Sequence, residues 1–385
     1  MQIYLDSCAT SAPRPEIINL VGETLTKNWG NPSSLHHWGE RATFILEKAR
    51  YQVASLINAP DAESIIFTSG GTEANNLAIF GVANSYDTPQ HIIISSVEHS
   101  AVSVPCAMLE KKGWQITRLS VDSHGIINAD DVKKALQPNT VLVSIIYGQS
   151  EIGTIQPVPE LVQIVKNNSS SLFHTDAVQG AGRITLDVES LGVDLLSLSA
   201  HKIYGMQGGG ALYIRQGVSI TPLNGGGGQE KAIRSGTQAL PAIASFGLAA
   251  ELAQQELPLE HIRLQKLRDY FFELLAPCDW LSITGHPFQR LPHHASFLIN
   301  HPNPELTARK MVRELNFAGI AISAGSACHS GNSVPSPILL ALGYNAIEAT
   351  KGIRFSFSRD TTPEDLAWTA MVVRQVGLIY NLSSR

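Results

Sequence analysis

The sequence predicts an α/β protein: a large domain built on an open, mostly parallel sheet with helices on both faces, and a smaller α+β domain. Short apolar runs alternate with helical stretches as far as Arg215, and this alternating pattern changes at about residue 255. A length of 385 residues also suits two domains better than one small core. We therefore expect a large domain over residues 15–254 and a small domain made of residues 1–14 and 255–385.

Six apolar runs of strand length make up the predicted sheet. They are SIIFTS from Ser64, HIIISS from His91, TVLVSII from Thr140, SLFHTDA from Ser171, DLLSLSA from Asp194 and GALYIR from Gly210. Helical stretches such as ATFILEKARYQVASLI and PELVQIVKNN lie between most of them. Ligands of such sheets bind beyond the carboxyl ends of the strands, so the chemistry is expected in TSGGT, VEHS, HTDAVQ and SAHK.

The predicted small domain begins with a long helical connector, ELAQQELPLEHIRLQKLRDYFFELL. It continues with the strand HHASFLIN, the helix PELTARKMVRELNFAG, the strand IAISAG, a loop rich in Gly, Ser and Pro, the strand GIRFSFSR and a terminal helix from Pro363.

Composition and charge are those of an ordinary soluble protein, with 44% hydrophobic residues, 16% charged residues and a net charge of −5. That charge does not argue for direct binding of nucleic acid or of an anionic membrane. We see neither a signal peptide nor an apolar run of membrane-spanning length, so a cytoplasmic location is expected. The cysteines at positions 8, 106, 278 and 328 lack metal-ligand spacing, so no zinc site is expected.

Ser69–Thr72 joins a predicted strand to a helix through two glycines. The N–H groups and the positive dipole end of that helix favour an anion such as a phosphate. A plain strand-to-helix turn is the other interpretation, because glycine turns are common.

Lys202 directly follows a buried strand and precedes a glycine-rich turn. An isolated lysine is normally a solvated charge. At the mouth of an α/β sheet, however, burial lowers the pKa of the amine and suits it to form a Schiff base. Ser199 and His201, on either side, are candidate phosphate donors.

Two other strand ends carry polar residues. Asp176 either caps the next helix or pairs with a protonated pyridine nitrogen, and Gln179 follows one turn later. His99 is either a polar residue at a helix start or a ring that stacks on a pyridine and moves protons.

Cys328 lies in AGSACHSGNSVPSP, among small and polar residues. A buried structural cysteine normally lies among apolar residues, so we expect Cys328 to be exposed and able to move. The other three cysteines have less informative contexts. A second glycine-rich loop, NGGGGQEKAIRSGT, runs from Asn224 to Thr237.

Together these motifs resemble the cysteine desulfurases, a branch of the fold-type-I, class-V aminotransferase-like enzymes that use pyridoxal 5'-phosphate. The resemblance extends from YLDSCATS to IRFSFSRDTTPEDL, and its most specific matches are TSGGTEANNLAI, VEHSAV, HTDAVQ, SAHKIYG, GGGQEKAIRSGT and ISAGSACHSGNSVPS. It implies a fold-type-I architecture with a seven-stranded sheet. It also implies conversion of L-cysteine to L-alanine with transfer of the sulfur to an acceptor.

The resemblance implies a cofactor role for each matching residue. Lys202 would hold pyridoxal phosphate as a Schiff base, Asp176 would pair with the pyridinium nitrogen, and His99 would stack on the ring. Gln179 would hydrogen-bond the phenolic oxygen. The phosphate would be held by Gly71, Thr72, Ser199 and His201, and by Thr237 from the neighbouring subunit of a homodimer.

The resemblance likewise implies the residues of the substrate. Arg354 would clamp the carboxylate as a bidentate fork, and Asn31 would lie near the substrate side. Cys328 would receive the sulfur as a persulfide, in a long loop similar to those of the NifS and IscS types. It is also a candidate transient iron–sulfur ligand shared with a partner. The sequence does not choose between His99 and His329 as the group that takes the thiol proton.

Two features depart from the family pattern. In YGQSEIGT, Ser150 replaces an asparagine that touches the cofactor, and a serine is shorter. The chain also ends at NLSSR, without the tail that IscS-type enzymes use to hold an iron–sulfur scaffold. The expected protein acceptor is therefore one of iron–sulfur assembly, or of a specialised DNA phosphorothioation or tRNA thiolation pathway.

Three other functions compete with this interpretation: a selenocysteine or cystine lyase, an aminotransferase, and a non-catalytic partner protein that keeps the fold. Cys328 argues against an aminotransferase. The intact set of Lys202, Asp176, His99 and Arg354 argues against a non-catalytic protein.

Overall fold

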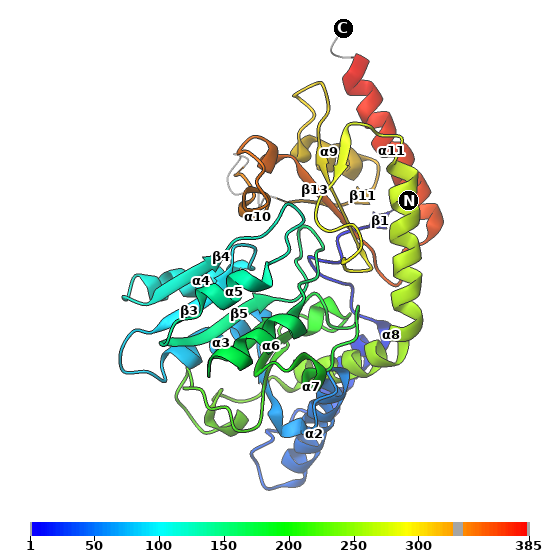
Figure 1. Ribbon diagram of the computed structural model, residues 1–385. Helices are drawn as coiled ribbons and strands as arrows, with labels where there is room; N and C mark the ends of the chain where they lie inside the picture. The colour runs from blue at the N-terminus through cyan, green and yellow to red at the C-terminus, as the bar shows by residue number, and fades with distance from the viewer. Residues whose placement is uncertain (1, 326–333, 383–385) are drawn as a thin grey trace.

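A seven-stranded sheet forms the centre of the large domain in the computed structural model, which describes residues 2–325 and 334–382 (Figure 1). Its strand order is β2-β8-β7-β6-β5-β3-β4, and β8 alone runs antiparallel to its neighbours. The strands are β2 (Ile65–Thr68), β3 (His91–Ser95), β4 (Gln115–Leu119), β5 (Thr140–Ile146), β6 (Leu172–Asp176), β7 (Leu195–Ser199) and β8 (Gly210–Ile214). The mostly parallel sheet and its six predicted strands are confirmed.

The strand β4 was not predicted from the sequence. It lies at the edge of the sheet, and most of its residues are half-buried or exposed. An edge strand of this kind lacks the continuous apolar run by which the inner strands are recognised.

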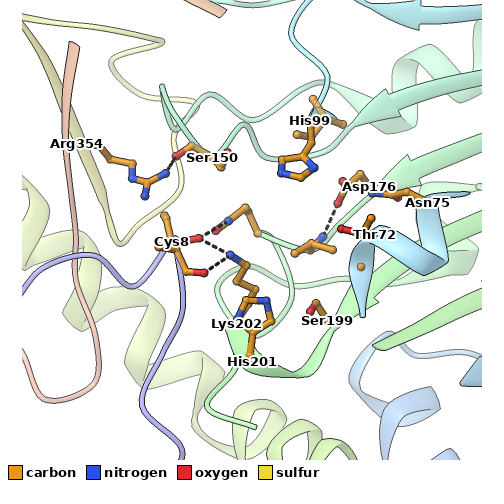
Figure 2. A pocket seen from close by; sticks show the side chains of 15 residues that line it. Cys8, Thr72, Asn75, His99, Ser150, Asp176, Ser199, His201, Lys202 and Arg354 are labelled. Atoms are coloured by element: carbon orange, nitrogen blue, oxygen red, sulfur yellow. Dashed lines mark hydrogen bonds between the residues drawn. The ribbon is translucent and has the colours of Figure 1, made fainter. Parts of the chain in front are cut away.

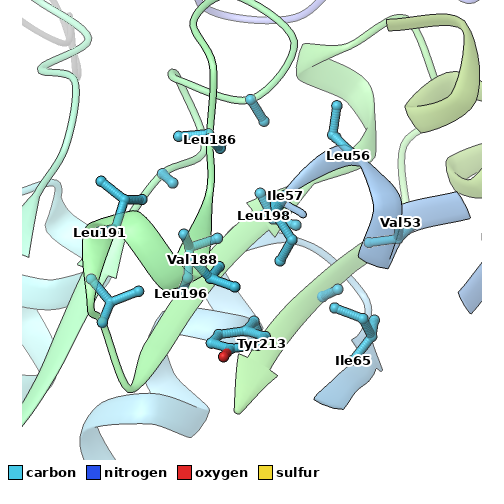
Figure 3. Packing of buried hydrophobic residues seen from close by; sticks show 14 of the residues in the cluster. Val53, Leu56, Ile57, Ile65, Leu186, Val188, Leu191, Leu196, Leu198 and Tyr213 are labelled. Atoms are coloured by element: carbon cyan, nitrogen blue, oxygen red, sulfur yellow. The ribbon is translucent and has the colours of Figure 1, made fainter. Parts of the chain in front are cut away.

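Alternate residues of the buried strands face opposite layers of helices. Ile65 and Tyr213 belong to one apolar cluster, and Ile66 and Leu212 belong to another. Figure 3 shows part of the first cluster, where side chains from α2 and α7 pack on β2, β7 and β8. The helices on this face are α1 (Pro15–Lys27), α2 (His37–Leu56), α5 (Ala129–Ala135), α6 (Val158–Asn168), α7 (Val188–Leu191) and the first half of α8 (Leu240–Leu275). The other face is covered by α3 (Gly71–Ala83) and α4 (Ser100–Glu110).

The small domain contains a four-stranded antiparallel sheet of order β12-β13-β10-β9 and a parallel pair, β1 with β11. Its elements are β1 (Ile3–Tyr4), β9 (Leu281–Ile283), β10 (His294–Ile299), α9 (Ala308–Phe317), β11 (Ile320–Ala321), β12 (Ser323–Ala324), α10 (Pro337–Ala341), β13 (Gly352–Ser356) and α11 (Pro363–Leu382). The expected strand IAISAG is thus divided between two sheets, and the expected helix from Pro304 begins only at Ala308, with Thr307 as its N-cap. The Thr307 hydroxyl accepts the Lys310 N–H, which fixes that start.

The helix α8 passes from one domain to the other (Figure 1). Its residues Leu240 to Ala253 pack in the core of the large domain, and Leu264 to Leu275 pack in that of the small domain. The predicted boundary between residues 254 and 255 falls inside this helix. Among the described residues, no helix has the length and apolar character needed to cross a membrane.

Candidate active site

A cavity of about 410 Å³ opens where the carboxyl ends of β2, β3, β5, β6 and β7 meet the small domain. Figure 2 shows Thr72, Asn75 and Asp176 at one end, Arg354 and Ser150 at the other, and Lys202 between them. The residues that line it are Cys8, Ala9, Gly71, Thr72, Asn75, His99, Ile146, Ser150, Asp176, Val178, Gln179, Ser199, His201, Lys202 and Arg354.

One end of the cavity is prepared for an anion. The helix α3 begins here, and its N-cap, Gly70, has no side chain to occupy the first N–H groups. A Cβ on Gly71 would lie only 2.7 Å from Val178 Cγ2, so glycine permits this close approach. The buried Ser199 hydroxyl has no hydrogen-bond partner in the described part of the chain. These features are what a phosphate group would satisfy.

His201 borders the same end of the cavity. Burial, aided by the Lys202 charge, lowers the pKa of His201 to about 4, so its ring is neutral near pH 7. Its Nδ1 lies 3.0 Å from the Thr10 hydroxyl. A neutral ring in this position can donate one N–H without adding a charge.

Lys202 ends a short 3-10 helix that directly follows β7. Its Nζ donates to the carbonyl oxygens of Cys8 at 2.5 Å and Ala9 at 2.7 Å, and it forms no ion pair within the described residues. Burial lowers the pKa of this amine, and Arg354 adds to the decrease, although the Cys8 thiol, Asp176 and Asp6 oppose it. The amine is therefore more available as a base or nucleophile than that of a surface lysine.

Asp176 is the last residue of β6, and its carboxylate is held on both oxygens. Asn75 Nδ2 donates to Oδ2 at 2.7 Å, and the Val178 N–H donates to Oδ1 at 3.0 Å. Asp176 is only 4% exposed, so these bonds fix the direction of a buried negative charge. Such a charge suits a cationic ring nitrogen.

His99 is the N-cap of α4, where its Nδ1 accepts the Ala101 N–H at 3.1 Å. In the neutral ring, the proton therefore lies on Nε2. The ring itself lines the cavity (Figure 2). His99 is therefore a helix-start residue whose ring also lines the cavity, and its stacking on a pyridine ring stays a prediction.

Arg354 approaches from β13 in the small domain. Its guanidinium donates to the Ser150 carbonyl at 3.0 Å and to Asp6 Oδ1 at 2.6 Å, and its buried Nε has no partner among the described residues. Burial opposes the charge, but the Cys8 thiol and Asp6 outweigh it and raise the pKa of Arg354. A permanent cation therefore closes the end of the cavity opposite the start of α3, where an anion can bind.

The remaining sequence-predicted residues do not all lie in this cavity. Thr237 and Asn31 are exposed and do not line this cavity, and Asn31 Oδ1 accepts the Ser33 N–H. Gln179 does line it, but its Nε2 donates to the Cys8 carbonyl at 2.9 Å. Cys328 and His329 lie outside the described residues.

Two cavity residues were missed from the sequence. Asn75 lies one helical turn after Thr72, within TSGGTEANNLAI, so helical spacing could have identified it. Cys8 was wrongly set aside with the other cysteines, whereas it lines the cavity next to Lys202. Sequence distance hid Cys8, because its segment reaches the cavity by crossing from the small domain. Within the described ranges, no cluster of three or more His, Cys, Asp or Glu side chains could hold a metal ion.

Comparison with known protein sequences identifies a family whose cofactor would suit this cavity. Residues 3–368 match the aminotransferase class-V family, whose members in general depend on pyridoxal phosphate. The chain is 44% identical over 377 residues to the cysteine desulfurase IscS of Dictyoglomus turgidum, covering 97% of this chain and 94% of that one.

Solved structures agree with the sequence comparison. A NifS-like protein superposes with a TM-score of 0.91 at 32% identity, covering 98% of this chain and 99% of the other. A structure described as SspA in complex with cysteine gives a TM-score of 0.80 at 31% identity, with 92% and 99% coverage. These matches span almost the whole chain and include the strand ends that carry Lys202 and Asp176. The chain therefore belongs to the cysteine desulfurases, a pyridoxal-phosphate-dependent branch of the class-V aminotransferase family.

Proposed function

We propose that this chain binds pyridoxal phosphate on Lys202, converts L-cysteine to L-alanine and passes the sulfur to Cys328 as a persulfide. One observation carries the proposal. Lys202 lies between two ends of the cavity. The buried Asp176 carboxylate and the start of α3, which can bind an anion, are on one side, and the Arg354 cation is on the other. An amino acid joined to the cofactor needs these groups in this order.

The residues at the cofactor end fit pyridoxal phosphate. The first turn of α3, the unpartnered Ser199 hydroxyl and His201 would hold the phosphate, with Thr72 beside them. Asp176 would pair with the ring nitrogen, and His99 would cover the ring. When bound, the cofactor supplies an electron-withdrawing ring that stores the charge left when the substrate loses its Cα proton.

The protein residues then bind the substrate and move protons. Arg354 would bind the substrate carboxylate through its unpartnered Nε and through N–H groups that do not donate to Asp6. Lys202, whose amine has a lowered pKa, would take the Cα proton and return it. Small side chains at Ser150 and Ala9 leave room for the substrate between these two residues.

Cys328 would complete the reaction by accepting the sulfur. Gly325 and Val334, the described residues that flank its segment, line a second cavity of about 470 Å³ that shares His99 and Ser150 with the first. The chain therefore enters and leaves the Cys328 segment beside the active site. The persulfide would go to a protein acceptor of iron–sulfur assembly or of a thiolation pathway, in the cytoplasm, where thiols remain reduced.

Product analysis tests this function. The purified yellow protein is expected to release alanine and, with a reductant, sulfide from L-cysteine. Cys328→Ser should keep the cofactor absorbance and lose steady-state turnover, whereas Cys106→Ala, which removes a thiol in the apolar core, should retain it. Full turnover by Cys328→Ser would instead identify a lyase that needs no nucleophile.

We also propose a homodimer with shared active sites. Five large apolar side chains are exposed on α2 and the segment before it, namely Trp29, Leu35, Trp38, Phe44 and Tyr51. Phe44 and Tyr51 are seven residues apart and share one face of α2. Exposed apolar surface of this kind favours association, and it would place the exposed Thr237 and Asn31 against a second copy. Sedimentation analysis should give twice the chain mass.

A further inference from the structure

Cys8 lies in the catalytic cavity, yet no step of the proposed reaction uses its thiol. Its N–H donates to Ser356 Oγ at 2.8 Å, and its carbonyl oxygen accepts from Lys202 and Gln179. Cys8 is thus held by β13 of the small domain and by the strand ends of the large domain. These three backbone contacts fix the position from which its side chain extends.

The Cys8 sulfur lies 3.4 Å from Nε2 of His293, and both side chains are buried. Burial, with the Arg183 charge next in effect, holds the pKa of His293 well below its usual value, so the ring is neutral. The other ring nitrogen, Nδ1, has no partner among the described residues. A proton on Nε2 therefore donates to the sulfur and leaves only a lone pair unsatisfied on Nδ1, which is the less costly arrangement.

Two basic side chains, Lys202 and Arg354, line the same cavity as Cys8. Lys202 Nζ lies 2.5 Å from the Cys8 carbonyl oxygen, and Arg354 lines the opposite end of the cavity. Since the proposed reaction places the substrate amine at Lys202 and the substrate carboxylate at Arg354, Cys8 lies beside the span that the substrate occupies.

Cys8 is not an isolated buried thiol. The same cavity contains two buried polar atoms without partners in the described structure, Ser199 Oγ and Arg354 Nε, which indicate independently that it is built to hold a ligand. Cys106 provides the contrast, because it lies among apolar residues of α3 and α4, and burial raises the pKa of its thiol to about 12.

We propose that Cys8 is a second sulfur acceptor, whose thiol takes sulfur from substrate cysteine inside the cavity and becomes a persulfide. This inference rests on the proposed function. A bond forms between Cys8 Sγ and the substrate sulfur, and the bond from that sulfur to the substrate Cβ breaks. The electron pair of the broken bond stays with the carbon, which takes the hydrogen given up by Cys8 and becomes the methyl group of alanine. L-Cysteine and one thiol thus give L-alanine and one persulfide, without a further oxidant or reductant.

The test uses the Cys328→Ser holoenzyme, in which the main acceptor is absent. After a single exposure to L-cysteine, the protein is alkylated, digested and analysed by mass spectrometry. The peptide with Cys8 is expected to carry one extra sulfur atom, and alanine formation should stop after a single turnover. An unmodified Cys8 peptide in a protein that keeps its cofactor absorbance would overturn the proposal.

Two double variants complete the test. Cys8→Ser/Cys328→Ser should form neither the persulfide nor alanine, whereas Cys106→Ala/Cys328→Ser should form both. Equal single-turnover alanine from the two double variants would also overturn the proposal. If the wild-type enzyme itself produced no alanine, the proposed function would be the part that failed. The peptide measurement on Cys328→Ser needs no change at Cys8, so a folding defect in a Cys8 variant leaves it intact.

Discussion

The two ends of the catalytic cavity are built differently. At the cofactor end, Asp176, Ser199 and Lys202 lie at the ends of adjacent strands of one sheet, and α3 starts beside them. At the substrate end, Asp6, Ser150 and Arg354 come from three distant parts of the chain and two domains. The first end follows from forming the sheet, whereas the second requires the small domain to be docked on it.

Polar contacts position the substrate end. His294 is neutral, because burial holds its pKa well below the usual value, and its Nε2 lies 3.1 Å from the Ser150 carbonyl. A carbonyl only accepts, so Nε2 carries the proton, and Nδ1 accepts from Arg290 Nη1 at 3.3 Å. Arg290 and His294 thus fix the carbonyl that in turn orients Arg354.

The largest expected effect concerns the cofactor end. Lys202→Ala should remove the visible absorbance of covalently attached cofactor and lower kcat by at least about 10²- to 10⁴-fold, the usual cost of losing a proton-transfer group. Absorbance spectra and alanine assays measure both. Lys133→Ala, at an exposed lysine on α5, is the matched control and should change neither. A retained covalent cofactor band in Lys202→Ala would contradict the assignment.

The substrate end should respond differently. Arg354→Gln is expected to keep the cofactor absorbance but to reduce kcat/KM for L-cysteine by about 30-fold to several thousand-fold, because removing one partner of a buried charge pair costs about 2–5 kcal/mol. Asp6→Asn should cost less, since Arg354 keeps its charge. Equal loss of cofactor binding and of kcat/KM in Arg354→Gln would show that the two ends are not separate.

The same contrast explains how much the sequence could predict. The cofactor-end residues were found because strand ends are local features, and strands such as DLLSLSA are recognisable without knowledge of the fold. The contacts of Cys8, Asp6 and Gln179 were not found, because they join residues more than 170 positions apart. Pairing of β1 with β11 brings the N-terminal segment into the small domain, and two-residue strands leave almost no periodic pattern to read.

The family resemblance supplied what local patterns could not. Arg354 is one positive residue within a mostly buried strand, and nothing in GIRFSFSR itself distinguishes a substrate clamp from a structural ion pair. The structure shows that Arg354 both forms the ion pair with Asp6 and lines the cavity. Conversely, the resemblance had no role for Cys8, which only the folded geometry brings to Lys202.

The weakest of these effects concerns Glu151, a buried carboxyl at the substrate end, and the pH dependence of stability. Glu151 lies there against Gly325, and a Cβ added to Gly325 would be 2.4 Å from Glu151 Oε1. Burial raises the pKa of Glu151 to about 7, although Ser336 and Arg354 act to lower it. The folded state therefore keeps a proton that the unfolded chain releases near pH 4.5. This contribution to stability is complete below that pH and is lost as the pH rises through about 7.

Glu151→Gln, which resembles the protonated carboxyl, should remove that loss. Between pH 6 and 8, the wild-type free energy of unfolding should fall by roughly 1–2 kcal/mol more than that of the variant, since one pKa unit corresponds to about 1.4 kcal/mol. Urea unfolding at several pH values measures this difference, with Glu305→Gln, at an exposed carboxylate of the small domain, as the control. Parallel pH profiles for wild type and Glu151→Gln would mean that Glu151 is ionised in the folded protein. The domain contact would then hold a second negative charge beside Asp6, with Arg354 as the compensating cation.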